Sequence, residues 1–183
     1  KRPMKFGVLG TGAVGKALAG KLVLLGHDVV MGTRGTDNES LQTWITRSGY
    51  PIRLGSFADA AVHGELLISC TVGASSVEAI RSCAKSDLAG KILIDVSNPL
   101  DLSKGMQAVT LTICNNDSLG ETIQREFPEL RVVKALNTCN SEVMGSPDRV
   151  PGDHDLFIAG NDSGAKEQVC DLLRSFGWRS HRC

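Results

Sequence analysis

The chain has 183 residues, of which 42% are hydrophobic and 22% are charged, and its formal net charge is zero. This composition is typical of a soluble globular protein, and a chain of this length can fold as one domain over residues 1–183 without disulfides or metal. The lack of a basic run argues against nucleic acid as a partner. No apolar run approaches the ~20 residues that a membrane span requires, so no membrane association is expected.

The cysteines are scattered along the chain, without a C-x-x-C pair or a histidine at zinc-finger spacing. This pattern predicts free thiols in a reducing compartment, and hence a cytoplasmic protein without a metal site. The cysteines are Cys70, Cys83, Cys114, Cys139, Cys170 and Cys183.

Strand-like and helix-like patterns alternate from the N-terminus onward. A buried strand is expected over residues 5–10, followed by an amphipathic helix that ends at Gly26. Ser75 and Ser118 each begin an S-x-x-E pattern, a capping box that predicts the start of a further helix. The other expected strands cover residues 28–32, 52–54, 65–71, 91–96, 131–136 and 155–159, and the other expected helices cover residues 38–48, 56–63 and 163–176.

This alternation of strands and helices predicts βαβ units and therefore a parallel sheet. Because crossover connections between parallel strands are right-handed, successive helices are placed on both faces of that sheet. The expected fold class is α/β, a doubly wound Rossmann-type parallel sheet with helices on both faces.

A glycine-rich loop joins the first expected strand to the first expected helix. In this strand–loop–helix context G-x-G-x-x-G predicts a dinucleotide site. Gly10 makes the tight turn, Gly12 lets the backbone approach a pyrophosphate, and Gly15 lets the helix pack against the sheet. The helix N-terminus then offers free N–H groups to the phosphates. The candidate loop residues are Gly10, Thr11, Gly12, Ala13, Val14 and Gly15.

The end of the second expected strand indicates which nucleotide binds. NAD-binding domains place an acidic residue there to hold the ribose 2′-hydroxyl. This chain has Thr33 and Arg34 instead, and its next acidic residue, Asp37, comes later. A hydroxyl and a guanidinium suit a 2′-phosphate, because arginine offers a planar fork of donors. The sequence therefore favours NADP(H) over NAD(H).

Four segments in order resemble one known family: GVLGTGAVGKALAGKL, GTR, DVSNPL and VVKALNTCNSEVM. Together they are similar to the NADPH-dependent deazaflavin oxidoreductases. That family is related to the cytosolic NADPH-binding domain of the six-transmembrane ferric reductases. The resemblance spans roughly Lys5 to Trp178. The family often has a lysine shortly after the arginine, where this chain has Asn38.

The resemblance implies an NADP(H)-dependent oxidoreductase that passes a hydride between nicotinamide and a deazaflavin or flavin-type acceptor. Residues 11–14 would contact the pyrophosphate, and Thr33 and Arg34 the 2′-phosphate. The adenosine and ribose side would be lined by Thr71, Val72 and Gly73. The nicotinamide and the second ring would be bordered by Asn98, Pro99, Asn137 and Thr138.

Hydride transfer to such an acceptor needs no nucleophile or acid–base pair, so no catalytic residue is expected. Asp95 is expected to bond backbone rather than act as a base, and Ser97 and Asn98 either bond the nicotinamide ribose or turn the chain. Two alternatives stay open: a non-catalytic NADP-binding or sensing module, and an imine or ketone reductase of the pyrroline-carboxylate reductase kind. The expected partner is a small-molecule redox acceptor. Because the family is commonly dimeric, the resemblance also allows a homodimer.

Overall fold

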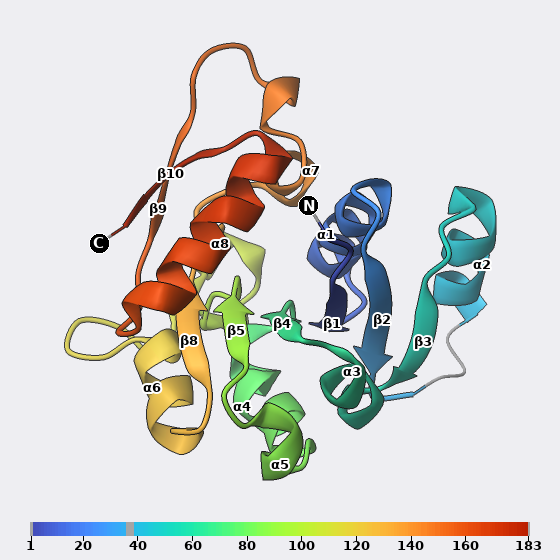
Figure 1. Ribbon diagram of the computed structural model, residues 1–183. Helices are drawn as coiled ribbons and strands as arrows, with labels where there is room; N and C mark the ends of the chain where they lie inside the picture. The colour runs from blue at the N-terminus through green and yellow to red at the C-terminus, as the bar shows by residue number, and fades with distance from the viewer. Residues whose placement is uncertain (1, 36–38, 183) are drawn as a thin grey trace.

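A central parallel sheet organises the protein in the computed structural model, which describes residues 2–35 and 39–182 (Figure 1). Its six strands have the order β3-β2-β1-β4-β5-β8. This order confirms the predicted α/β Rossmann-type fold, in which the chain reverses direction across the sheet between β1 and β4. The strands are β1 (Lys5–Leu9), β2 (Asp28–Thr33), β3 (Arg53–Ser56), β4 (Leu66–Ser69), β5 (Ile92–Asp95) and β8 (Arg131–Lys134).

Helices cover both faces of this sheet, as the alternation predicts. One apolar cluster joins one face of the strands to α1, α7 and α8, and α2 packs against it through Trp44 and Ile45. A second cluster joins the other face to α3, α4, α5 and α6. The helices are α1 (Ala13–Leu24), α2 (Glu39–Ser48), α3 (Phe57–His63), α4 (Gly73–Arg81), α5 (Lys85–Leu88), α6 (Leu119–Glu126), α7 (Ser141–Met144) and α8 (Ser163–Phe176).

Local signals place several helix ends correctly. At the start of α8 the Asp162 carboxylate accepts the N–H of Ala165 at 2.7 Å, and Gly177 ends this helix with a φ of 108°. Ser118 caps α6 as expected, since its hydroxyl accepts the N–H of Glu121. The expected first residue of α2, Asn38, and the nearby Asp37 lie outside the described residues.

The capping box predicted at Ser75 is wrong. The N-cap is Val72, three residues before Ser75, so helix α4 begins at Gly73, and the N–H of Ser75 already bonds the carbonyl of Val72. The reason is tertiary: Gly73 packs directly against Asn98 and Pro99. The chain therefore turns into the helix at Gly73.

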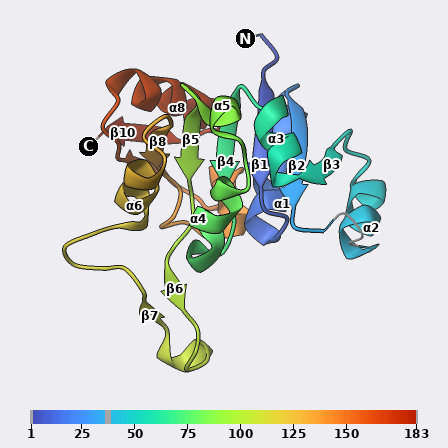
Figure 2. The same ribbon diagram turned by 90° about the horizontal axis from the view of Figure 1, so that it is seen from below.

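Other elements lie outside the central sheet. Antiparallel strands β6 (Leu100–Asp101) and β7 (Thr110–Leu111), with η1 (Met106–Ala108) between them, form an arm that projects from the body (Figure 2). The expected strand at residues 155–159 exists as β9 (Asp155–Ile158), but it pairs in parallel with β10 (Arg179–Arg182).

A single bridge, between Lys134 and Ala159, connects this small sheet to β8. A short 3-10 helix, η2 (Pro147–Arg149), precedes β9. Over residues 2–35 and 39–182, no helix combines the length and apolar character that crossing a membrane would need.

The cap of α8 yields a stability prediction. Asp162→Ala removes the acceptor of the Ala165 N–H and should lower the free energy of unfolding by about 1 kcal/mol. Asp162→Asn keeps an acceptor oxygen and should lose less than half as much. Urea unfolding followed by circular dichroism measures both variants. Equal losses for the two would show that the cap does not stabilise this helix.

Candidate nucleotide-binding site

The glycine loop lies where β1 meets α1, at the carboxyl edge of the sheet. Gly10 has a φ of 118°, and a Cβ there would lie 2.7 Å from the carbonyl oxygen of Cys70. A Cβ on Gly15 would lie 2.2 Å from the carbonyl oxygen of Gly10. Neither position has room for a side chain, so the two glycines let the first turn of α1 sit against the end of β1.

Gly12 differs from these two glycines because it faces open space. It is the N-cap of α1, it is exposed, and a Cβ there would meet no atom within 4 Å. No side chain of residues 2–35 or 39–182 caps this helix end. The first-turn N–H groups of a 12-residue helix therefore face outward without a side-chain acceptor. Such an end suits an anionic phosphate, so the chain fits the pyrophosphate of a dinucleotide here.

Thr33 is the last residue of β2, and Arg34 begins the turn that follows it. The Thr33 hydroxyl donates to the carbonyl of Gly35 at 3.1 Å and accepts the N–H of Gly35 at 3.4 Å. Arg34 is exposed, and the part of the chain that the structure describes offers its guanidinium no hydrogen bond or ion pair. Among the described residues this guanidinium thus has no partner, and the turn lies at the end of β2, the strand next to β1 and its glycine loop.

The loops after β4, β5 and β8 meet at the same edge. A Cβ on Gly73 would lie 2.3 Å from the carbonyl oxygen of Asn98 and 2.6 Å from the Cα of Pro99. The Asn98 side-chain amide donates to the carbonyl of Asn137 at 2.8 Å, and the Asn137 amide donates to the Asn98 side-chain oxygen at 3.3 Å. Thr138 follows as an exposed residue. The segments that the family resemblance selects are thus in direct contact.

The turn out of β8 is strained at Leu136. Its φ is 63° although its side chain is buried. A non-glycine residue in the left-handed region costs about 1–2 kcal/mol. This turn places the carbonyl of the next residue, Asn137, where Asn98 can bond it.

A buried polar network lies beneath these loops. The Thr71 and Ser76 hydroxyls are 2.9 Å apart, and the Ser97 hydroxyl donates to the carbonyl of Thr71 at 2.9 Å. Asp95, fully buried, accepts the N–H of Ser97 at 3.0 Å. The expectation that Asp95 bonds backbone is therefore confirmed. It also pairs with Lys134.

Sequence reasoning missed Ser76 and Lys134. The signal for Lys134 was available, because a lysine inside the apolar run VVKAL calls for a buried acidic partner. Ser76 sits on the inner face of α4, and only the contact between α4 and the end of β5 shows its role.

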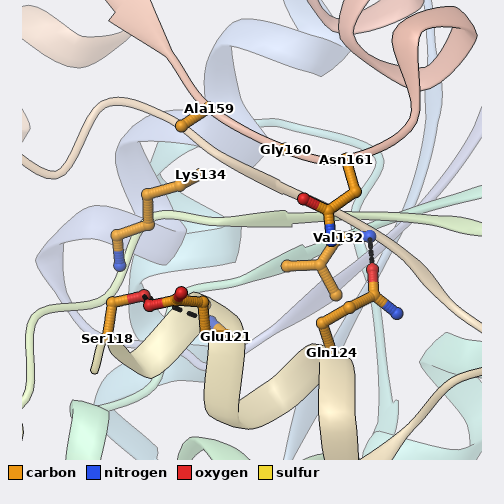
Figure 3. Close-up of a pocket in the computed structure, with 9 residues that line it drawn as sticks. Ser118, Glu121, Gln124, Val132, Lys134, Ala159, Gly160 and Asn161 are labelled. Atoms are coloured by element: carbon orange, nitrogen blue, oxygen red, sulfur yellow. Dashed lines mark hydrogen bonds between the residues drawn. The ribbon is translucent and has the colours of Figure 1, made fainter. Parts of the chain in front are cut away.

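A pocket of about 310 Å³ opens beside β8 (Figure 3), the edge strand that β4 and β5 separate from β1 and its glycine loop. It lies between α6, β8 and the loop after β9. Apart from Lys134, its walls are separate from the nucleotide site. The lining residues are Ser118, Gly120, Glu121, Gln124, Val132, Lys134, Ala159, Gly160 and Asn161.

Desolvation affects the two thiols that lie near the site. Burial is the main cause that raises the pKa of the Cys70 thiol far above its usual range, and the nearby Asp95 carboxylate adds to it. Burial likewise raises the pKa of the Cys139 thiol. Both groups are therefore neutral thiols at physiological pH, as structural cysteines are.

Comparison with known proteins identifies the family. Residues 5–99 match the family model "NADP oxidoreductase coenzyme F420-dependent". A crystal structure from Arthrobacter sp. FB24, provisionally described as an F420-dependent NADP reductase, is 46% identical with a TM-score of 0.92, over 98% of this chain and 83% of that one.

Two curated relatives are each 30% identical to this chain. The rat metalloreductase STEAP3 matches over 97% of this chain, and the match covers 33% of the length of STEAP3. The F420-dependent NADP reductase of Methanocaldococcus jannaschii matches over 68% of this chain and 56% of its own length. The chain belongs to the NADP oxidoreductase, coenzyme F420-dependent, family.

Proposed function

We propose that this protein is an NADP(H)-dependent oxidoreductase that passes a hydride between nicotinamide and a deazaflavin of the F420 type. The observation that carries the proposal is the open backbone at Gly12, where the uncapped N-terminus of α1 faces outward. Arg34, exposed at the neighbouring turn, adds the charge that selects a 2′-phosphate. Membership of the F420-dependent family supports the acceptor.

The site residues then divide by the part of the nucleotide that they touch. Residues 11–14 of the glycine loop hold the pyrophosphate, and Thr33 and Arg34 hold the 2′-phosphate. The adenosine and ribose side is lined by Thr71, Val72 and Gly73. The residues that border the nicotinamide and the second ring are Asn98, Pro99, Asn137 and Thr138. The contact between Asn98 and Asn137 supports this last assignment, because it fixes two loops at one point of the edge.

The chemistry makes few demands on the side chains. When bound, NADPH supplies a hydride from its nicotinamide ring, and the acceptor ring takes up its two electrons. The protein must hold the two rings close together and limit the access of water. The paired amides of Asn98 and Asn137 suit this role because they are neutral and already hydrogen-bonded to each other. The proton that completes the reduced acceptor can come from water, so no side-chain proton donor is required at this point.

We also propose that residues 1–183 form a single NADP-binding domain. One apolar cluster includes residues from Phe6 in β1 to Trp178 after α8, which supports this proposal. The Trp178 indole N–H donates to the carbonyl of Met144 at 2.8 Å, so the end of α8 is anchored near α7.

Gly12→Ala and Gly15→Ala should separate binding from folding. At Gly12 a methyl group has room in the protein but would occupy the space of the pyrophosphate. This variant should keep its melting temperature and lose at least about tenfold in NADPH affinity, or ~1.4 kcal/mol. Gly15→Ala should lower the melting temperature, because its Cβ would clash with Gly10. Calorimetry and a binding titration measure both; full NADPH affinity in Gly12→Ala would contradict the assignment.

Arg34→Ala should weaken NADPH far more than NADH. Losing a charge-assisted phosphate contact costs about 1.5–3 kcal/mol, which is roughly 10- to 150-fold in affinity. Arg47→Ala, at an exposed position in the last turn of α2, is the matched control and should change neither affinity. Fluorescence titration with both nucleotides decides the matter. An equal loss for NADPH and NADH in Arg34→Ala would overturn the 2′-phosphate role.

The acceptor can be identified with a panel. Mixing the protein with NADPH and F420, FMN or FAD should oxidise NADPH fastest with F420, as followed at the nicotinamide absorbance. Gly12→Ala, expected to fold but to bind NADPH poorly, provides the background rate. In a parallel assay with cyclic imines, reduction of the imines but of none of these three acceptors would favour the imine reductase alternative. Tight NADPH binding without any reduction would favour the sensing module.

A further inference from the structure

Lys134 is the charged residue that ends strand β8, directly after the buried Val132 and Val133. It follows Val133 in β8, and its side chain is only 23% exposed. Its backbone is in register with Asp95, the last residue of the neighbouring β5. The ammonium group lies 2.8 Å from the Asp95 carboxylate, which is completely buried.

This ion pair holds both backbone groups of one residue in the next loop. Asp95 Oδ1 accepts the N–H of Ser97 at 3.0 Å, and the Lys134 ammonium donates to the carbonyl oxygen of Ser97. The Ser97 hydroxyl in turn donates to the carbonyl of Thr71, after β4. Lys134 therefore anchors one loop directly and a second loop through Ser97.

The anchored residue immediately precedes the paired amides at the site edge. Asn98 follows Ser97 and donates to the carbonyl of Asn137, which itself follows Lys134 by three residues. The loop from Ser97 to Pro99 is thus fixed at its start by Lys134 and Asp95, and one residue later by Asn137. Gly73 closes the same loop from the α4 side.

Stability alone does not explain a buried charge at this position. Desolvation of two charges offsets most of their attraction, and apolar replacements of buried pairs are often neutral or stabilising. What an apolar pair could not do here is bond the N–H and the carbonyl of Ser97 together. The polar pair therefore gives this loop one defined conformation.

We propose that Lys134 is a positioning residue which, with Asp95, fixes the loop of Ser97 and Asn98 against the nicotinamide ring. This inference rests on the proposed function, since it assumes that NADPH binds at this edge. Its ammonium bonds Asp95 and Ser97, so in this role Lys134 acts through Ser97.

Lys134→Met tests the role, because methionine keeps much of the side chain and removes the ammonium. The double variant Asp95→Asn/Lys134→Met avoids leaving an unpaired buried carboxylate, and serves if the single variant does not fold. Lys91→Met is the matched control. Lys91 is also part-buried and donates to a backbone carbonyl, that of Ala61 at 2.6 Å, but it lies at the opposite end of β5.

Three measurements separate positioning from a merely structural role. The affinity for 2′-phospho-ADP-ribose, which lacks nicotinamide, should stay within about twofold of the unmutated protein. The fluorescence anisotropy of the nicotinamide in bound NADPH should fall, because the ring is less immobilised. With the acceptor found active, kcat should fall by about 10- to 100-fold while KM for NADPH changes by less than about threefold. Lys91→Met should change none of these.

The outcomes distinguish this proposal from the proposed function. Unchanged anisotropy and kcat in both Lys134 variants would overturn the positioning role. An equal loss of affinity for NADPH and for 2′-phospho-ADP-ribose would overturn it too. A mobile nicotinamide in the unmutated complex would overturn it as well. If the unmutated protein immobilises NADPH but reduces no acceptor, hydride transfer fails while the anisotropy still tests Lys134. If it binds neither nucleotide, both proposals fail.

Discussion

The close approach of α1 to the end of β1 is the constraint on which the rest of the site depends. A side chain at Gly15 would collide with the Gly10 carbonyl, and one at Gly7 would come within 2.2 Å of the Ala60 carbonyl on the other face. Helices α1 and α3 therefore pack against opposite faces of β1 so closely that only glycine fits at positions 7 and 15. This packing aims the first turn of α1 across the carboxyl edge of the sheet, where its free N–H groups can meet a phosphate.

The polar groups at that edge form two kinds of arrangement. Around the glycine loop they are left open: Gly12 faces solvent, and Arg34 extends from a turn that Thr33 stabilises. Beneath the loops after β4, β5 and β8 they bond one another, as the contact between Asn98 and Asn137 illustrates. Open donors suit recognition of phosphate charge, whereas an internally bonded frame suits the fixed placement of an uncharged ring.

Features encoded by neighbouring residues could be predicted from the sequence, and features made by distant contacts could not. The position of the glycine loop between β1 and α1 and both ends of α8 depend on residues within a few positions of each other, and these positions are confirmed. The start of α4 was misplaced because the packing of Gly73 under Asn98, 25 residues later, overrode the capping signal at Ser75.

Contacts that depend on the order of the strands could not be predicted either. The bonds between Asn98 and Asn137, and the pair of Asp95 with Lys134, both require that β5 and β8 be neighbours. Periodicity identifies the strands of the central sheet but not which strands are neighbours. Strand β10 was missed for this reason, since its short polar sequence becomes a strand only by pairing with β9. Which part of the nucleotide each predicted binding residue contacts also stays a prediction.

The backbone hydrogen bonds of Lys134 affect how the protein unfolds locally. Its N–H donates to the carbonyl of Ala159 at 2.7 Å, and its carbonyl accepts the N–H of Ala159 at 3.1 Å, so one residue joins the small β9–β10 sheet to the central one. The same residue holds Ser97 through its side chain. Peeling β9 away from β8 would therefore also loosen the loop at the site edge. We therefore expect the C-terminal layer and the edge of the sheet to unfold as one cooperative unit, in which opening one part also costs the contacts of the other.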